Sequence, residues 1–351
     1  MPTALEGLNP AQVTAWARRE GLPLEGPLLP TSVEGGHSNL TYLLDAADGR
    51  RWVLRRPPLH NVVESAHDVG REFRIMSALA GSAVPVPRMV ASCDDLSVLG
   101  SPFFVMEFVE GFVLHDADET ERSIPEAHRG ELTTALVDTF ASLHQVDAED
   151  VGLGDLGRRH DYVGRQLRRW SRQWDATAVR DVPLVGELHH RLSEQQPQQA
   201  GFAIVHGDFR LDNCIVGPTG EVRAVLDWEL CTLGDPLADL GTSLAYWLHS
   251  DEEPYEGIAG PSRAVGMPTR DAFVARYAEQ TGADLAELPY YVALACWKIA
   301  IILDGVYARY AAGAMGERSW DHAGLLRTAD RLLIRARDEL DGWDRSRNRA
   351  D

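Results

Sequence analysis

The sequence predicts an α+β protein of two lobes, in which a small antiparallel sheet with one main helix precedes a larger, mainly helical lobe. Apolar and polar residues alternate from Leu40 to Leu44, and a turn at Asp48-Gly49 leads into a second strand. After Gly111 the apolar residues recur at helical spacing instead. The length of 351 residues suits one bilobal domain or two ordinary ones.

The first lobe is predicted to span residues 1–109. Asn9-Pro10 is expected to begin a helix over about residues 9–21, because proline fits the first helical turn. A strand is expected at Arg51 to Arg56, a helix from about Ala66 to Ala80, and the last strand at Phe103 to Phe108.

The second lobe is predicted to span residues 110–351, with the boundary near Glu110-Gly111. Ser123 and Glu126 form the pattern of a capping box around Pro125, which predicts a helix running towards His144. Further elements follow from apolar spacing. They are a helix at Tyr162 to Trp174, short strands at Ala203 to Val205 and Val222 to Leu226, and a buried core helix around Tyr290 to Leu303.

Composition excludes several classes of function. A formal net charge of −19 argues against nucleic acid as the partner, because nucleic-acid binding needs a dense cationic surface. The four cysteines form no C-x-x-C pair, so neither a zinc site nor a disulfide framework is indicated. Residues 1–10 lack the features of a signal peptide, and the longest apolar stretch is interrupted by Lys298. We therefore expect a cytoplasmic protein that has no membrane partner.

The segment from His206 to Asn213 (HGDFRLDN) carries the chemistry. Asp208 and Asn213 lie five residues apart on one loop after an apolar strand, and Asp227 follows the next strand. Phosphoryl transfer needs a carboxylate that deprotonates the acceptor hydroxyl, and oxygen ligands that hold Mg²⁺ against the phosphates. The pattern predicts Asp208 as the base and Asn213 and Asp227 as Mg²⁺ ligands. Each residue alone could be an ordinary turn or cap residue.

The order and spacing of these residues resemble the aminoglycoside phosphotransferase family, whose relatives include choline kinase. The resemblance covers about Val33 to Met315. It is strongest to the subgroup with H-G-D-x-x-x-x-N followed by D-W-E, which also occurs as a kinase domain fused to acyl-CoA dehydrogenases. It implies a bilobal protein-kinase-like fold that binds ATP or GTP with Mg²⁺ and phosphorylates a small-molecule hydroxyl.

Several residues of the small lobe are expected to bind the nucleotide. Gly35, Gly36, Ser38 and Asn39 lie between two strands and could cradle phosphates, although Gly-Gly in a hairpin is often only a turn. Around the last strand, an adenine would use the backbone groups of Glu107 and Val109.

Arg55 occupies the strand position where kinases carry a lysine, and Glu72 lies on the inward edge of the following helix. Alternation from Val53 favours Arg55 over Arg56 as the inward residue. We expect Arg55 to bind the α/β-phosphates while Glu72 holds it in place. A solvated strand charge and a surface glutamate are the alternative.

Fewer than ten residues separate Asp227 from the helix start predicted at Asp235-Pro236. There is no room for the long activation loop of protein kinases, which favours a small-molecule acceptor over a peptide. Asp235 and Asp239 are interpreted as a helix cap and a loop anchor. On an extended chain the side chain of Glu229 points the same way as that of Asp227. Glu229 is therefore either a further metal or substrate ligand or an ordinary glutamate.

One helix face is basic, with Arg165, Arg168, Arg169 and Arg172 at spacings of three and four. Such a face is commonly a solvated surface, but Arg165 and Arg169 are candidates for binding an anionic acceptor. Two acceptor classes therefore stay open, a cationic aminoglycoside-like compound and an anionic hydroxyacyl or CoA-type compound. A catalytically silent nucleotide-binding or scaffolding protein is the alternative from another class, and the oligomeric state is unknown.

Overall fold

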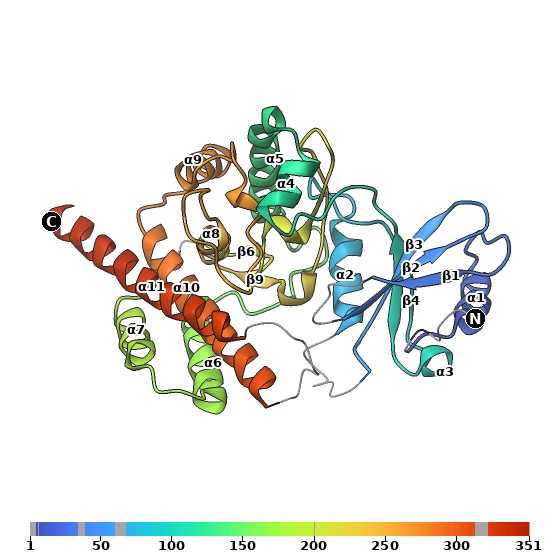
Figure 1. Cartoon of the computed structure of the whole chain (residues 1–351), viewed down its shortest axis with the longest axis horizontal. Helices are drawn as coiled ribbons and strands as arrows, with labels where there is room; N and C mark the ends of the chain where they lie inside the picture. Colours follow the sequence, from blue (N-terminus) through green and yellow to red (C-terminus); the bar gives the residue numbers. More distant parts are fainter. Residues whose placement is uncertain are drawn as a thin grey trace. The chain divides into compact units, whose positions relative to one another are not determined.

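The computed structural model describes residues 5, 7–33, 39–59, 68–199, 201–312 and 322–350 (Figure 1). The chain divides into two compact units. The first comprises residues Met1–Gly111 together with Arg223–Leu230, and the second comprises Phe112–Val222 and Cys231–Asp351. The return of Arg223–Leu230 to the first unit was not anticipated from the sequence.

The first unit contains a five-stranded antiparallel sheet with strand order β1-β2-β3-β5-β4. The strands are β1 (Leu29–Ser32), β2 (Leu40–Asp45), β3 (Arg51–Arg56), β4 (Met89–Cys93) and β5 (Phe103–Glu107). The central β3 alternates strictly between its two faces, with Trp52, Leu54 and Arg56 buried on one of them. Arg55 therefore belongs to the opposite face.

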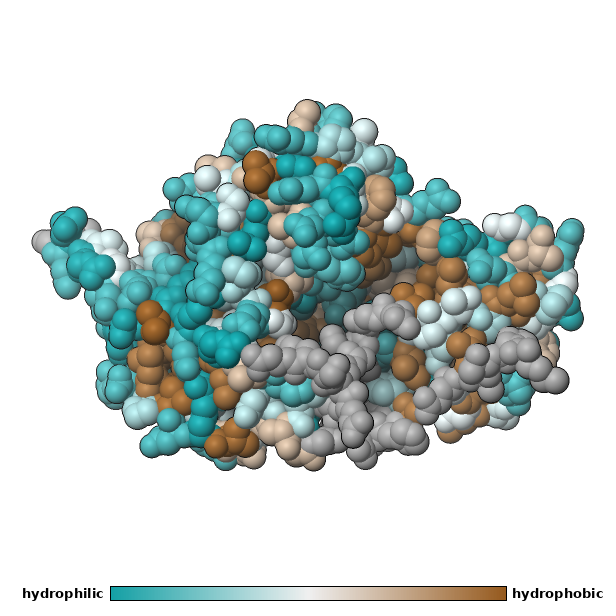
Figure 2. Space-filling view, viewed as in Figure 1, coloured by the Kyte–Doolittle hydropathy of each residue, from teal (hydrophilic) through white to brown (hydrophobic). Residues whose placement is uncertain are grey.

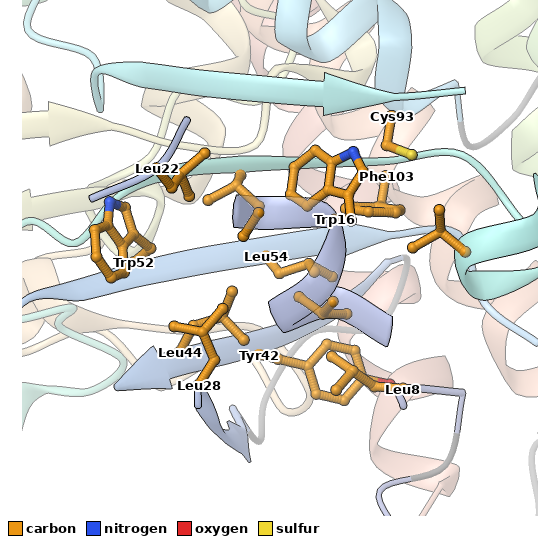
Figure 3. Close-up of a cluster of buried hydrophobic side chains, with 14 of the residues drawn as sticks. Leu8, Trp16, Leu22, Leu28, Tyr42, Leu44, Trp52, Leu54, Cys93 and Phe103 are labelled. Carbon is orange, nitrogen blue, oxygen red and sulfur yellow. The ribbon is translucent and has the colours of Figure 1, made fainter. Parts of the chain in front are cut away.

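An N-terminal helix covers one face of this sheet. Helix α1 (Pro10–Arg19) begins where the sequence predicts, because the Asn9 side chain accepts hydrogen bonds from the backbone N–H groups of Ala11 and Gln12. Trp16 of α1 packs edge-on against Phe103, with ring centroids 4.7 Å apart (Figure 3). A short helix, α3 (Leu96–Leu99), completes this side.

Helix α2 (Val69–Leu79) is the main helix of the first unit. Asp68 caps it by accepting from the N–H of Arg71. Its inward stripe contains Val69, Ile75, Met76 and Leu79, and the same stripe includes Glu72, which is only 1% exposed. A charged residue is rarely buried without a partner, so this position points to an ion pair.

The second unit is mainly helical, as the sequence predicts. Its helices are α4 (Ala117–Ser123), α5 (Glu126–Gln145), α6 (Tyr162–Thr177), α7 (Pro183–Glu194), α8 (Pro236–Tyr246), α9 (Arg270–Thr281), α10 (Leu288–Ala311) and α11 (Ala323–Ala350). Strands β6 (Ala203–Val205) and β9 (Thr232–Gly234) pair antiparallel. The outer side of α4 and α5 is mostly hydrophilic (Figure 2).

The predicted capping box at the start of α5 is wrong. Ser123 is the last residue of α4, and Pro125 itself occupies the cap position of α5 without a side-chain hydrogen bond. Since a proline has no N–H and fixes its own φ, a chain can turn from one helix directly into the next at this point. The Ser123 and Glu126 pattern therefore spans the end of α4 and the start of α5, and it is not a capping box.

Helix α10 is long and apolar enough to cross a membrane by length and composition, but 72% of its most apolar window is buried inside the second unit. It packs against α6, α8 and α11. It therefore forms the core helix that the apolar stretch around Tyr290 to Leu303 predicts.

Candidate active site

The predicted catalytic loop follows β6 in the second unit. The loop closes with a 3₁₀ turn at Leu211–Asn213, which brings the Asn213 amide back to Asp208. Asn213 Nδ2 donates to the Asp208 carbonyl at 2.8 Å and to its carboxylate Oδ2 at 3.1 Å. Because the amide nitrogen is engaged in this way, the amide oxygen is the atom of Asn213 that can ligate a cation.

Asp239 on α8 anchors the start of this loop. Its carboxylate accepts from the backbone N–H of His206 at 2.6 Å and from that of Gly207 at 2.8 Å, and it lies 3.2 Å from His144 Nε2. Burial would raise the pKa of Asp239, but the hydrogen bond from His144 and the loop amides hold it below its usual range. The loop is therefore held by an ionised, buried carboxylate, as the sequence interpretation proposed.

The other two residues interpreted as structural have matching positions. Asp235 caps α8 by accepting from the N–H of Leu237, and it also accepts from the Tyr291 hydroxyl at 2.7 Å. His206 is fully buried, and its Nδ1 accepts from the N–H of Asp208 at 3.3 Å. His206 thus supports the loop from within.

Arg210 contacts the predicted base, Asp208, and the sequence interpretation missed it. Its guanidinium lies 3.2 Å from Asp208 and 3.1 Å from Asp212, and it stacks over the Tyr246 ring at 4.6 Å. Burial raises the pKa of Asp212, and Arg210 opposes that shift. The available signal was an arginine placed between two aspartates, Asp208 and Asp212, in the same loop. Arg210 orients the carboxylate of Asp208 from the side opposite to Asn213.

The other half of the predicted site lies in the first unit. Arg55 Nη1 donates to Glu72 Oε1 at 2.6 Å, and its Nη2 donates to Asp227 Oδ1 at 3.1 Å. Asp227 has a left-handed backbone with φ of 63°, which is uncommon outside glycine although aspartate adopts it more readily than most residues. Such a conformation is common where a side chain must be aimed at a ligand.

The electrostatics of this cluster are dominated by burial. Burial raises the pKa of Glu72 to about 7, although the charge of Arg55 opposes the shift, and the nearby carboxylates of Asp227 and Glu229 raise it further. Glu229 lies in the 3₁₀ turn Trp228–Leu230, and its carbonyl accepts from Arg71 at 3.3 Å. Three carboxylates thus surround a single arginine.

A divalent cation would fit the oxygen ligands that these residues offer. The described parts of the chain contain no group of three His, Cys, Asp or Glu residues arranged to hold a metal ion. Mg²⁺ does not need one, because it is commonly held by one or two protein oxygens together with water and phosphate oxygens. Asn213 in the second unit and Asp227 in the first unit each offer an oxygen of the kind that Mg²⁺ binds.

Only some of the remaining residues predicted to bind the nucleotide lie in the described part of the chain. Gly35, Gly36 and Ser38 lie outside the described residues. Asn39 is buried, and its Oδ1 has no hydrogen-bond partner among the described residues. Glu107 ends β5, where its N–H donates to the Arg88 carbonyl and its side chain forms an ion pair with Arg88. Val109 follows on a half-buried segment.

The predicted basic face of α6 separates into individual contacts. Arg168 forms an ion pair with Asp161 at 2.5 Å, Arg172 donates to the Arg168 carbonyl, and Arg165 donates to the Arg158 carbonyl at 2.7 Å. Arg169 stacks over Trp170 at 5.1 Å and forms no salt bridge with any described residue. The four arginines do not act as one surface.

A five-stranded antiparallel sheet with one main helix, followed by a mainly helical unit, is the architecture of a phosphotransferase of protein-kinase-like fold. The comparisons with known proteins agree, since a family model matches residues 31–291. The chain belongs to the phosphotransferase enzyme family.

Relatives and solved structures extend this result. The chain is 36% identical over 305 residues to acyl-CoA dehydrogenase family member 10 of Mus musculus and 37% identical over 313 residues to family member 11 of Gallus gallus. These matches cover 86% of the chain but only 28% and 39% of the two relatives.

Two solved structures share the fold. A Ralstonia eutropha structure assigned to the aminoglycoside phosphotransferases is 33% identical, with a TM-score of 0.80 over 95% of this chain and 98% of that one. Choline kinase from Cryptosporidium parvum is 10% identical, with a TM-score of 0.68 over 96% and 97% of the two chains. The predicted resemblance and fold class are confirmed.

Proposed function

We propose that this protein is a kinase of small hydroxyl-bearing metabolites that uses Asp208 as its base. The observation that carries the proposal is the loop geometry, in which the Asp208 carboxylate is held between the Asn213 amide and the Arg210 guanidinium. A carboxylate fixed at two sides keeps the orientation that proton transfer requires.

The proposed reaction is a transfer of the γ-phosphoryl group. The acceptor oxygen forms a new P–O bond, the bond to the nucleoside diphosphate breaks, and the acceptor proton passes to Asp208. Asn213 and Asp227 would hold Mg²⁺, which when bound neutralises charge on the phosphates. Arg55, supported by Glu72, would bind the α/β-phosphates, and Glu107 and Val109 would bind the base of ATP or GTP through their backbone groups.

For the acceptor we propose a hydroxyacyl compound, as a free acid or a CoA thioester. Relatives that match most of this chain are named as acyl-CoA dehydrogenase family members. This chain would phosphorylate a hydroxyacyl compound related to acyl-CoA. Arg169, which forms no salt bridge with any described residue, supports an anionic acceptor over a cationic one. An aminoglycoside-like acceptor is the second candidate, favoured by the net charge of −19 and by the Ralstonia structure.

The test is a transfer assay with purified protein, Mg²⁺ and either ATP or GTP. Medium-chain hydroxy acids, their CoA thioesters and a set of aminoglycosides serve as acceptors, and the product is detected by mass spectrometry. Phosphorylated hydroxyacyl product would support the proposal. Phosphorylated aminoglycoside alone would transfer support to the second candidate. If nucleotide binds but neither transfer nor hydrolysis occurs, the protein is a silent binding or scaffolding member of the fold.

A further inference from the structure

Lys298 is the only lysine in the chain. The sequence contains 34 lysine and arginine residues, and every other one is arginine. Lys298 is also the only charged residue between Leu288 and Leu303 of the apolar helix α10. Arginine supplies every other side-chain cation of lysine or arginine type, so the compact, flexible ammonium group distinguishes this position.

The ammonium of Lys298 lies beside the catalytic loop. Nζ is 3.4 Å from the carbonyl oxygen of Gly207, the residue directly before Asp208, and 3.4 Å from Thr242 Oγ1. Both distances are at the long limit for hydrogen bonds, and an ammonium carries three donors. No described carboxylate forms a salt bridge with Lys298. The ammonium is therefore not tied to a carboxylate of the described residues, and part of the side chain remains accessible.

A second cation comes from the neighbouring helix. Helices α6 and α10 pack side by side in the second unit (Figure 1), and Gly305 of α10 faces Gln173 and Thr177 of α6. Arg169 lies one turn before Gln173 on α6. Burial lowers the pKa of Lys298, the charges of Asp208 and Asp239 oppose this, and the charge of Arg169 lowers it further. Lys298 lies seven residues before Gly305 on α10, so the two packed helix faces carry one cation each.

We propose that Lys298 and Arg169 form a binding site for an oxyanion of the acceptor, a carboxylate or a phosphate, next to the catalytic loop. This inference rests on the proposed function and assigns the feature by which the acceptor is recognised. A bound oxyanion would neutralise both cations and use the free ammonium donors and the planar guanidinium together.

The same face of α10 suggests what the rest of such an acceptor contains. Ile302 and Val306 follow Lys298 by four and eight residues and are half-buried. Apolar side chains in line with a cation suit a molecule with an apolar chain beside its anionic group. A hydroxy acid of medium chain length combines these features.

The single lysine allows a direct experiment on the full chain. Protein grown on lysine labelled with ¹³C at Cε gives one Lys298 cross-peak, which is followed in the presence of Mg²⁺ and the analogue AMP-PNP. A medium-chain hydroxy acid, its CoA thioester and its uncharged methyl ester are then titrated. We expect the cross-peak to shift with the free acid or the thioester and not with the methyl ester. A shift with the free acid would identify the carboxylate as the bound group. A shift with the thioester alone would identify a phosphate of CoA.

Variants separate the site from general charge effects. Arg169→Gln is expected to raise the acceptor Kd and KM by about tenfold or more, the loss of one charge-assisted hydrogen bond. The neighbouring Arg168→Gln is the matched control, because Arg168 is engaged by Asp161, and it should leave both values within about twofold. Neither variant should change the nucleotide KM.

Two results would overturn the site. One is a Lys298 cross-peak that responds to AMP-PNP alone and to no acceptor anion, which would make Lys298 part of the nucleotide site. The other is an equal effect of Arg169→Gln and Arg168→Gln on KM. Failure of the proposed function has a different signature. In that case no acceptor is phosphorylated, while the cross-peak still shifts with the acid and Arg169→Gln still weakens the shift.

Discussion

Arg55 Nη2 lies 3.1 Å from Asp227 Oδ1, although the two residues are 172 positions apart in the sequence. The arginine that is proposed to bind phosphates therefore neutralises the carboxylate that is proposed to bind Mg²⁺. Glu72 holds the same guanidinium at 2.6 Å from its other side. Because Arg55 contacts both carboxylates, substitutions in this cluster should affect metal and nucleotide binding together, in a pattern that distinguishes their roles.

Replacing the base tests the proposed chemistry. Asp208→Asn should lower kcat by about 10²–10⁴-fold, because a general base typically contributes that much. The amide can still accept from Asn213, so nucleotide affinity should stay close to that of the wild type. Steady-state kinetics and nucleotide titration check both values, with the exposed Asp251→Asn as control. Turnover near the wild-type rate would remove Asp208 from the role of base.

Asp227 is expected to act through the metal. Asp227→Ala should weaken nucleotide binding in the presence of Mg²⁺ by about 100-fold or more. Loss of a residue that only supports a metal ligand already costs about 10–100-fold. Binding in EDTA should change much less, as calorimetry can show. Glu229→Gln in the adjacent turn is the comparison. An equal Mg²⁺-dependent loss there would add Glu229 to the ligands, whereas equal losses with and without Mg²⁺ would argue against both.

The Arg55–Glu72 pair should behave as a coupled unit. A double-mutant cycle with Arg55→Gln and Glu72→Gln should give a coupling free energy of about 0.5–3 kcal/mol in nucleotide binding. Arg56→Gln provides the contrast, since Arg56 is buried on the other face of β3 and donates to the carbonyls of Gly7 and Leu99. It should lower the melting temperature without coupling to Glu72. Strictly additive effects of Arg55 and Glu72 would show that the pair does not act in binding.

Glu72 should also make stability depend on pH. Burial raises its pKa from 4.5 to about 7, so between these values the folded state binds a proton that the unfolded state does not. Stability from this group is therefore fully present below about pH 4.5 and is lost as the pH rises through about 7. Glu72→Gln should flatten the melting temperature over this window, as calorimetry at several pH values can measure. An unchanged slope would mean that Glu72 is ionised throughout.

Asp239 is expected to support the catalytic loop through its charge. Asp239→Asn leaves the amides of His206 and Gly207 with a neutral, weaker acceptor, and unfolding free energy should fall by about 3–5 kcal/mol, as for other broken buried pairs. Denaturant unfolding measures this loss, with the exposed Asp181→Asn as control. A loss below about 1 kcal/mol would show that hydrogen bonding, and not the charge, anchors the loop.

Local patterns predicted much of the fold. The N-cap at Asn9, the strand from Arg51 to Arg56 and the start of α6 at Tyr162 all agree with the structure, because caps and periodicity depend on residues within a few positions. The capping box at Ser123 failed for the same reason. A four-residue pattern cannot distinguish the start of one helix from the end of the one before it.

The sequence by itself determined the composition of the candidate catalytic loop, the face of β3 that carries Arg55, and the family to which the chain belongs. Spacing within a loop and alternation along a strand are properties of the local backbone, so they can be recognised without the fold. Tertiary structure alone decided which charges meet. Arg55 contacts Asp227, and Lys298 lies beside Gly207. Arg168 forms an ion pair with Asp161, whereas Arg169 forms no salt bridge with any described residue. These partners are set by how distant elements pack, because the strength of a charge interaction depends on distance and burial in space and not on separation along the chain.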